Sequence, residues 1–159
     1  MINAAIVGLG WWGHHIVSSL QGKTQKLHFI WAIDSNSQID RDFLDVNDIQ
    51  FSTNFEDALN DDKVDAVILA TPHSFHDEQI VHAAGAGKHV FCEKPMAMNS
   101  VEAIAMEQAA LKANRVLAID FQTRFEWDTQ EARRLVTTGV LGTPHFARAS
   151  YFCLLYTSP

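Results

Sequence analysis

The chain has 159 residues, of which 47% are hydrophobic and 19% are charged, and its formal net charge is −7. This balance is typical of one globular domain with a sizeable core. The 12 Lys and Arg residues form no cluster that could follow a nucleic-acid backbone, and no apolar run reaches membrane-spanning length. We therefore expect neither a nucleic-acid nor a membrane partner, and the start MINAAIVGLG lacks a basic leader.

The two cysteines, Cys92 and Cys153, could form at most one disulfide, so a reducing compartment is favoured and we expect a cytoplasmic protein. Cys153 opens the final segment CLLYTSP, residues 153–159. The codons TGT CTC TTA TAC ACA TCT CCG spell this segment and resemble the transposase-end adapter of sequencing libraries. We expect an adapter-derived tail on a truncated gene fragment; the alternative is an ordinary apolar strand end.

Apolar runs typical of buried strands alternate along the chain with segments that have helical spacing of apolar residues. Strands are predicted at 4–10, 27–34, 51–53, 64–70, 88–92, 116–121 and 145–152. Helices are predicted after Gly10, with Gly13, Ile16, Val17 and Leu20 on one face, and at 39–46, 55–59, 73–86, 100–113 and 126–138. Alternation of this kind predicts an α/β fold, a Rossmann-type doubly wound parallel sheet.

Capping residues mark several of these helices. Asn54 with Asp57 and Asn99 with Glu102 resemble capping pairs. Thr71 is placed to cap the helix at 73–86, with Pro72 at its first position. The glycines Gly85, Gly87 and Gly139 are expected to end helices.

The predicted organisation has a dinucleotide-binding domain at 1–122 and a junction at 123–152. The junction would hold only the first strand, 145–152, of a second α+β domain. Gly139–Pro144 (GVLGTP) is the best candidate boundary.

The segment GLGWWG, residues 8–13, has the spacing of a phosphate-binding turn between a strand and a helix. Gly8 would allow the sharp turn, Gly10 the close approach of a pyrophosphate, and Gly13 close helix packing. Asp34 ends the second predicted strand and is placed to accept hydrogen bonds from a ribose, which favours NAD over NADP. The alternative is a structural turn followed by a strand-end aspartate.

Aromatic and imidazole side chains follow this turn. At least one of Trp11 and Trp12 is expected to face the cofactor or a second domain, and core packing accounts equally well for the other. His14 and His15 point about 100° apart on a helix, and His73 and His76 lie at a helix start, so we expect no metal site.

The segment AGKHVFCEKPMA, residues 86–97, carries the most specific pattern. Together with GLGWWG, TPHSFH at 71–76 and the later TRF and GVLG, it resembles the glucose–fructose oxidoreductase, inositol dehydrogenase and rhizopine-catabolism (Gfo/Idh/MocA) family. The resemblance runs from Ile2 to about Phe152 and covers that family's nucleotide-binding domain.

The resemblance implies roles for particular residues. Lys94 would be the catalytic lysine beside substrate and nicotinamide, positioned by Glu93 and Pro95, with a candidate cis bond before Pro95. The cofactor-binding residues would be Gly8, Leu9, Gly10, Trp11, Trp12, Gly13, Asp34, Thr71, Pro72, His73, His76, Glu93, Lys94, Pro95 and Arg124. His73 stands where the family often has asparagine, and Arg124 matches an arginine near the domain junction.

An ammonium at a strand's carboxyl end can hydrogen-bond a substrate hydroxyl, which agrees with a catalytic lysine. The alternative for Lys94 is a surface ion pair with Glu93. The family implies hydride transfer between NAD and a sugar, cyclitol or polyol, completed by an aspartate and a histidine of a second domain through which members commonly form homo-oligomers. We therefore expect these 159 residues to bind NAD(H) without turnover. A non-catalytic NAD sensor and an NAD-assisted glycosidase or epimerase remain open.

Overall fold

The computed structural model describes residues 1–150, so the expected adapter tail at 153–159 lies outside the described residues. The chain divides into a first unit, Met1–Asp120, and a second unit that begins at Phe121. In the first unit, six parallel strands lie in the order β3-β2-β1-β4-β5-β6, as the sequence predicts for a doubly wound sheet. The strands are β1 (Ile2–Val7), β2 (Leu27–Ile33), β3 (Gln50–Ser52), β4 (Ala66–Leu69), β5 (His89–Glu93) and β6 (Leu117–Asp120).

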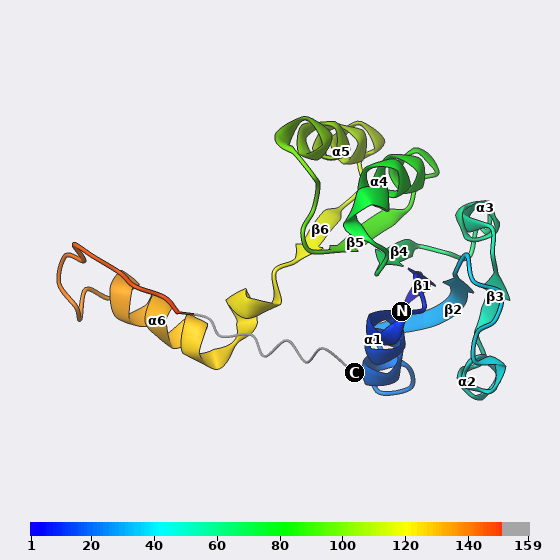
Figure 1. The fold of residues 1–159 in the computed structure, drawn as a ribbon, viewed down its shortest axis with the longest axis horizontal. Coiled ribbons are helices and arrows are strands. Elements are labelled where there is room, and N and C mark those ends of the chain that lie inside the picture. The colour runs from blue at the N-terminus through cyan, green and yellow to red at the C-terminus, as the bar shows by residue number, and fades with distance from the viewer. Residues whose placement is uncertain (151–159) are drawn as a thin grey trace, which may run out of the picture. The chain divides into compact units, whose positions relative to one another are not determined.

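Helices cover both faces of this sheet (Figure 1). The helices α1 (Trp11–Leu20) and α2 (Arg41–Asn47) pack on one face, and Val17 and Leu44 are buried there against Ile6 and Phe29. The opposite face carries α3 (Phe55–Leu59), α4 (His76–Gly85) and α5 (Ser100–Ala113), whose Leu59, Ile80 and Met106 pack on Val67 and Val90. Apolar runs such as AVIL in β4 are needed because both faces of the sheet are buried.

Side-chain caps fix where several helices begin. Asp40 accepts a hydrogen bond from the Phe43 N–H at 3.0 Å and starts α2. Asn99 accepts from the Glu102 N–H at 3.0 Å, while Glu102 reaches back to the Met98 N–H at 2.9 Å. The predicted capping pair of Asn99 and Glu102 is therefore confirmed, with the return bond made to the residue before the cap. At α3, Asn54 caps by accepting from the Glu56 N–H.

The start of α4 differs from the prediction. A 3-10 turn, η1 (His73–Phe75), precedes the α-helix, which begins only at His76. The Phe75 N–H donates to the Pro72 carbonyl at 3.0 Å and tightens the chain there. Thr71 is not the cap, because its hydroxyl donates to Gln79 Oε1 at 2.6 Å.

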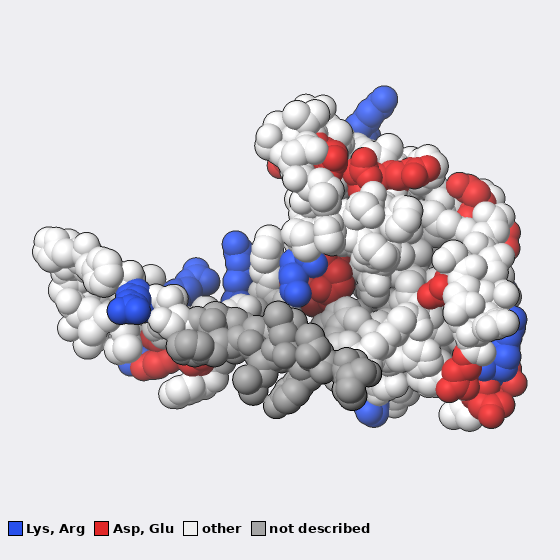
Figure 2. All heavy atoms as spheres, in the orientation of Figure 1, with Lys and Arg blue, Asp and Glu red and all other residues white. Residues whose placement is uncertain are grey.

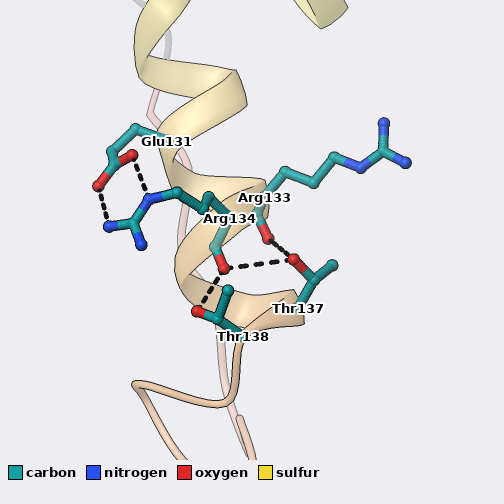
Figure 3. A network of polar contacts seen from close by, with 5 residues as sticks. All are labelled: Glu131, Arg133, Arg134, Thr137 and Thr138. Atoms are coloured by element: carbon teal, nitrogen blue, oxygen red, sulfur yellow. Dashed lines mark hydrogen bonds and ion pairs between the residues drawn. The ribbon is translucent and has the colours of Figure 1, made fainter.

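The second unit is described by itself. It contains the 3-10 turn η2 (Gln122–Phe125) and α6 (Trp127–Thr137). The Arg134 guanidinium donates to the Glu131 carboxylate at 2.6 and 2.7 Å, and the hydroxyls of Thr137 and Thr138 donate to carbonyls one turn earlier (Figure 3). At the end of α6 the N–H groups of Thr138 and Gly139 donate to the carbonyls of Arg134 and Val136, and Gly139 takes a φ of 74°.

The strand predicted at 145–152 is wrong for residues 145–150, which are exposed and form no strand. Residues 151 and 152 lie outside the described part. A strand needs a neighbour for its backbone hydrogen bonds, and none of the described strands pairs with this segment.

Within residues 1–150, every helix is too short or too polar to cross a bilayer. Acidic side chains gather around α2 in the view of Figure 2, and the Lys and Arg side chains seen there are scattered.

Candidate nucleotide-binding site

The turn between β1 and α1 requires glycine at two of its three glycine positions. Gly8 has a φ of 91°, and a Cβ there would lie 2.7 Å from the Ala70 carbonyl oxygen. A Cβ on Gly13 would lie 2.0 Å from the Gly8 carbonyl oxygen, so Gly13 allows α1 to pack directly on the turn. A Cβ on Gly10 would meet nothing within 4 Å, so the space above Gly10 is open.

The first turn of α1 is built to receive an anion. Its N-cap is Gly10, which provides no side-chain cap, and its first turn carries no acidic residue. The free N–H groups and the positive end of the helix dipole favour a phosphate at this position. The Leu9 N–H is already used, because it donates to Asp34 Oδ2 at 2.6 Å. Leu9 itself is buried in the core and helps to hold the turn, and its contact with a cofactor stays a prediction.

Asp34 follows β2 directly and is half-buried at the edge of a cavity of about 410 Å³. Its Oδ1 accepts from the Asn36 N–H at 2.8 Å, so the carboxylate is fixed by two backbone bonds. Each carboxylate oxygen keeps a second lone pair, which suits the two hydroxyls of a ribose. The other cavity-lining residues include Gly8, Gly10, Ser35, Thr53, Phe55, Thr71, Pro72, Phe75 and Gln79.

The cavity lies where the strand order reverses, since β1 pairs with β2 on one side and with β4 on the other. Ligands of open α/β sheets bind at such a switch point, beyond the carboxyl ends of the strands. A second cavity of about 470 Å³ lies between α5 and β6 and is lined mainly by apolar side chains such as Leu111 and Leu117. That cavity has no helix N-terminus or fixed carboxylate, so the β1–β4 crevice is the better nucleotide site.

The loop after β4 fastens this crevice to the turn after β5. His76 is buried, and its two ring nitrogens lie 3.0 Å from the carbonyl oxygens of Thr71 and Pro95. The nitrogen that carries the proton donates to the carbonyl oxygen it faces, so His76 helps to hold the two loops together, and its contact with a cofactor stays a prediction. His73 is exposed and does not line the cavity.

Lys94 follows β5 and its side chain is exposed. The Lys94–Pro95 bond is cis, as predicted. Among the ion pairs of residues 1–150, none joins Lys94 to Glu93. Glu93 is only 7% exposed, and its Oε1 accepts a hydrogen bond from the Trp12 indole N–H. The surface ion pair considered as an alternative is therefore absent from this part of the chain.

Two groups near this turn have shifted pKa values. Burial raises the pKa of Glu93, the Trp12 hydrogen bond partly offsets that increase, and the neighbouring Asp120 adds to it. Burial, with a further contribution from the Glu93 charge, raises the pKa of the Cys92 thiol to about 12. Cys92 is therefore an unreactive core residue, because the thiolate is the reactive form.

Aromatic rings cluster at the start of α1. The Trp11 and Trp12 ring centroids are 5.4 Å apart, and His15 stacks on both at 5.9 and 5.1 Å. Trp11 is 79% exposed, whereas Trp12 turns toward Glu93. His14 packs on Phe43 of α2, and residues 1–150 contain no group of three metal-ligating side chains.

Some site residues were not foreseen from the sequence. Phe75 and Gln79 line the crevice, and Asp120 lies in register with Glu93 on the neighbouring strand. A signal existed for Asp120, because it is the penultimate residue of the strand predicted at 116–121, much as Asp34 is the last residue of the strand predicted at 27–34. Arg124 belongs to the second unit, where its guanidinium lies 5.1 Å from the Phe121 ring centroid, and its role stays a prediction.

The glycine turn, the open N-terminus of α1 and the fixed Asp34 define a dinucleotide-binding α/β domain. Comparison with known proteins agrees. The model of the oxidoreductase family with an NAD-binding Rossmann fold, GFO_IDH_MocA, matches residues 2–121. The chain belongs to this family, and it has that family's NAD-binding domain.

The proteins that the chain resembles include sugar and cyclitol enzymes. It is 49% identical over 80 residues to the D-glucoside 3-dehydrogenase of Escherichia coli. This match covers 50% of the chain and 23% of that protein. It is 29% identical over 143 residues to the 2,7-anhydro-N-acetylneuraminate hydratase of E. coli. That match covers 89% of the chain and 37% of the hydratase. The structure of the scyllo-inositol dehydrogenase of Lactobacillus casei, solved with NAD(H) and scyllo-inositol, superposes with a TM-score of 0.82 at 28% identity. The superposition covers 89% of this chain and 42% of that dehydrogenase. The chain thus spans less than half the length of these proteins.

Proposed function

We propose that this chain is the NAD(H)-binding part of a dehydrogenase acting on a carbinol carbon of a sugar, cyclitol or similar polyol. The observation that carries the proposal is the placing of three features at one edge of the sheet. The open N-terminus of α1, the fixed Asp34 and the exposed Lys94 all follow the carboxyl ends of parallel strands.

Each feature has a distinct task in this proposal. The N–H groups of α1 hold the pyrophosphate, and Gly10 leaves room for it. Asp34 accepts the ribose hydroxyls and repels a 2′-phosphate, and its neighbours Ser35 and Asn36 supply no cation, which favours NAD over NADP. Lys94 hydrogen-bonds the substrate hydroxyl and helps to manage its proton. When bound, the nicotinamide accepts or supplies the hydride.

The relatives support the substrate class. One is a D-glucoside 3-dehydrogenase, and another is a scyllo-inositol dehydrogenase solved with NAD(H). Because the chain spans less than half of each, the activity is proposed for the whole protein. For the 159 residues alone we propose nucleotide binding without turnover, in the cytoplasm, where a reduced Cys92 and an NAD(H) pool fit together.

A reaction without net oxidation is the second candidate, and one observation favours keeping it. One of the relatives that match 89% of the chain is a hydratase by name, whereas another with the same coverage is an inositol 2-dehydrogenase. An enzyme that uses NAD transiently would form product without accumulating NADH. A non-catalytic NAD sensor would bind the nucleotide and form no product.

The proposal is tested at Lys94 in two ways. First, the exposed lysines of the 159-residue chain are labelled with an amine reagent, with and without NADH, and modification is read by peptide mass spectrometry. NADH should slow labelling of Lys94 and leave the exposed Lys112 of α5 unchanged. Equal rates at Lys94 with and without NADH would contradict a nucleotide beside this residue.

Second, the protein expressed from the source open reading frame is assayed with glucosides and inositols. NADH should accumulate, and Lys94→Met should lower kcat by about 100-fold or more while NADH affinity is retained. Product without NADH would favour the second candidate. Tight NADH binding with no product across the panel would favour the sensor.

A further inference from the structure

One hydrogen bond joins the glycine turn to the end of β5. Trp12, the second residue of α1, donates its indole N–H to Glu93 Oε1. Glu93 is the last residue of β5 and is 7% exposed, so its carboxyl group is largely removed from water. The element that receives the phosphate is thereby tied to the residue directly before Lys94.

A second carboxyl group lies beside Glu93. Asp120 ends β6 and is paired in register with Glu93. Val90 and Cys92 face the α4–α5 side, as Leu117 and Ile119 do, so Glu93 and Asp120 both face the α1 side. Neighbouring strands lie about 4.8 Å apart, which brings the two carboxyl groups into direct proximity.

The surroundings favour a proton on Glu93. Two carboxyl groups that share a site do not both ionise readily, and burial acts in the same direction. Among the ion pairs within residues 1–150, none includes Glu93 or Asp120. The other titratable groups around Glu93 are Lys94 next along the chain, Cys92 on the opposite face and His15, whose ring stacks on Trp12. The raised pKa of Glu93 agrees with a retained proton.

We propose that Glu93, buried beside Asp120, keeps a proton, and that its change of charge makes the domain distinguish NAD⁺ from NADH. The inference rests on the proposed NAD(H) site. A dinucleotide bound across the switch point spans both halves of the sheet, and Asp34 assigns the adenosine to the β2 half. The nicotinamide then belongs to the half formed by β4, β5 and β6, which carries the pair.

The charges decide the direction of the effect. The oxidised nicotinamide ring is a cation and the reduced ring is neutral. Loss of the Glu93 proton to solvent adds one negative charge beside Asp120, and that charge attracts only the cation. NAD⁺ binding therefore favours release of one proton, and NAD⁺ affinity increases with pH relative to NADH affinity. One extra unit charge about 10 Å away, at an effective dielectric of about 20, changes the ratio of dissociation constants by about tenfold.

The test measures dissociation constants of the 159-residue chain for NAD⁺ and NADH by calorimetry, from about pH 5 to about pH 9. The ratio of the NADH to the NAD⁺ constant should rise about tenfold for the wild type across this range. Glu93→Gln keeps an oxygen acceptor for Trp12 and should make the ratio flat. Glu107→Gln, at an exposed position on α5, removes the same charge and should behave as the wild type.

Two further readouts separate this role from a structural one. Trp12→Phe removes the N–H that lowers the pKa of Glu93, so the rise in the ratio should move to higher pH. Carboxyl ¹³C NMR should show the titration of Glu93 moving to lower pH on addition of NAD⁺ and remaining in place with NADH. If both nucleotides bind with a ratio that does not change with pH, the inference is overturned and the proposed function stands. If neither binds, both fail.

Discussion

The close contact between Gly13 and Gly8 makes a sharp prediction for Gly13→Ala. A Cβ at position 13 would lie 2.0 Å from the Gly8 carbonyl oxygen and 3.0 Å from its carbonyl carbon. Both atoms belong to the backbone of a turn whose own φ is 91°, so neither can rotate away as a side chain could. The start of α1 must move instead.

The size of the effect follows from the distance. Ordinary contact between a Cβ and an oxygen begins at about 3.5 Å, so α1 would shift by roughly 1.5 Å. Overpacking of this kind typically lowers the free energy of unfolding by about 1–3 kcal/mol. A clash with rigid backbone belongs at the upper end of this range, about 3 kcal/mol. For a unit of this size we expect a decrease in Tm of roughly 10 °C. The same shift would displace the N–H groups of α1, so NADH affinity should fall as well.

Two matched glycine variants provide the controls. A Cβ on Gly10 or on Gly85 would meet nothing within 4 Å. Gly10→Ala should therefore leave Tm within about 2 °C and still weaken NADH binding, because its methyl group would occupy the space left for the phosphate. Gly85→Ala, at the end of α4, should change neither property appreciably.

Thermal unfolding and NADH calorimetry on the three variants make the comparison. A Gly13→Ala chain with the stability and NADH affinity of the wild type would refute the packing of α1 on the turn. A Gly10→Ala chain that binds NADH normally would refute the placing of the phosphate above Gly10.

Three further predictions concern stability and selectivity. The pKa of Glu93 is raised in the folded chain, so the stability that this group contributes below its unfolded pKa is lost as pH rises through its folded pKa. Glu93→Gln should therefore gain stability relative to the wild type as pH increases. A difference in the free energy of urea unfolding that does not change with pH would count against the buried proton. Asp34→Asn removes the charge that repels a 2′-phosphate, so the ratio of NADPH to NADH affinity should increase by about tenfold, and an unchanged ratio would show that Asp34 does not set the preference. Asn99→Ala removes the cap of α5 and should cost about 1 kcal/mol in urea unfolding while NADH affinity stays constant; loss of binding would mean that α5 acts on the site.

Much of the fold could be predicted from the sequence because its signals are local. The buried run at 64–70 predicts a central parallel strand, and β4 lies there at Ala66–Leu69. The capping pair of Asn99 and Glu102 is satisfied within one turn of chain, so α5 begins where predicted. The strand prediction was wrong at 145–150 because an alternation of apolar and polar residues does not supply a partner strand.

The site was only partly predictable for the same reason. Glycine spacing and the position of Asp34 are properties of one βαβ unit, and they predicted the crevice. The Thr71–Gln79 hydrogen bond and the two carbonyl contacts of His76 depend on how the loop after β4 folds. The Trp12–Glu93 bond joins residues 81 positions apart, and no local pattern encodes it.

The most direct test of the NAD(H) site is an amide ¹H–¹⁵N NMR titration of the 159-residue chain with NADH. The largest saturable shifts should fall on the amides of Gly10, Trp11, Trp12 and Gly13, with further shifts around Asp34 and Thr71 at the crevice. Saturable shifts confined to the cavity between α5 and β6, or no saturable shift at all, would contradict the account.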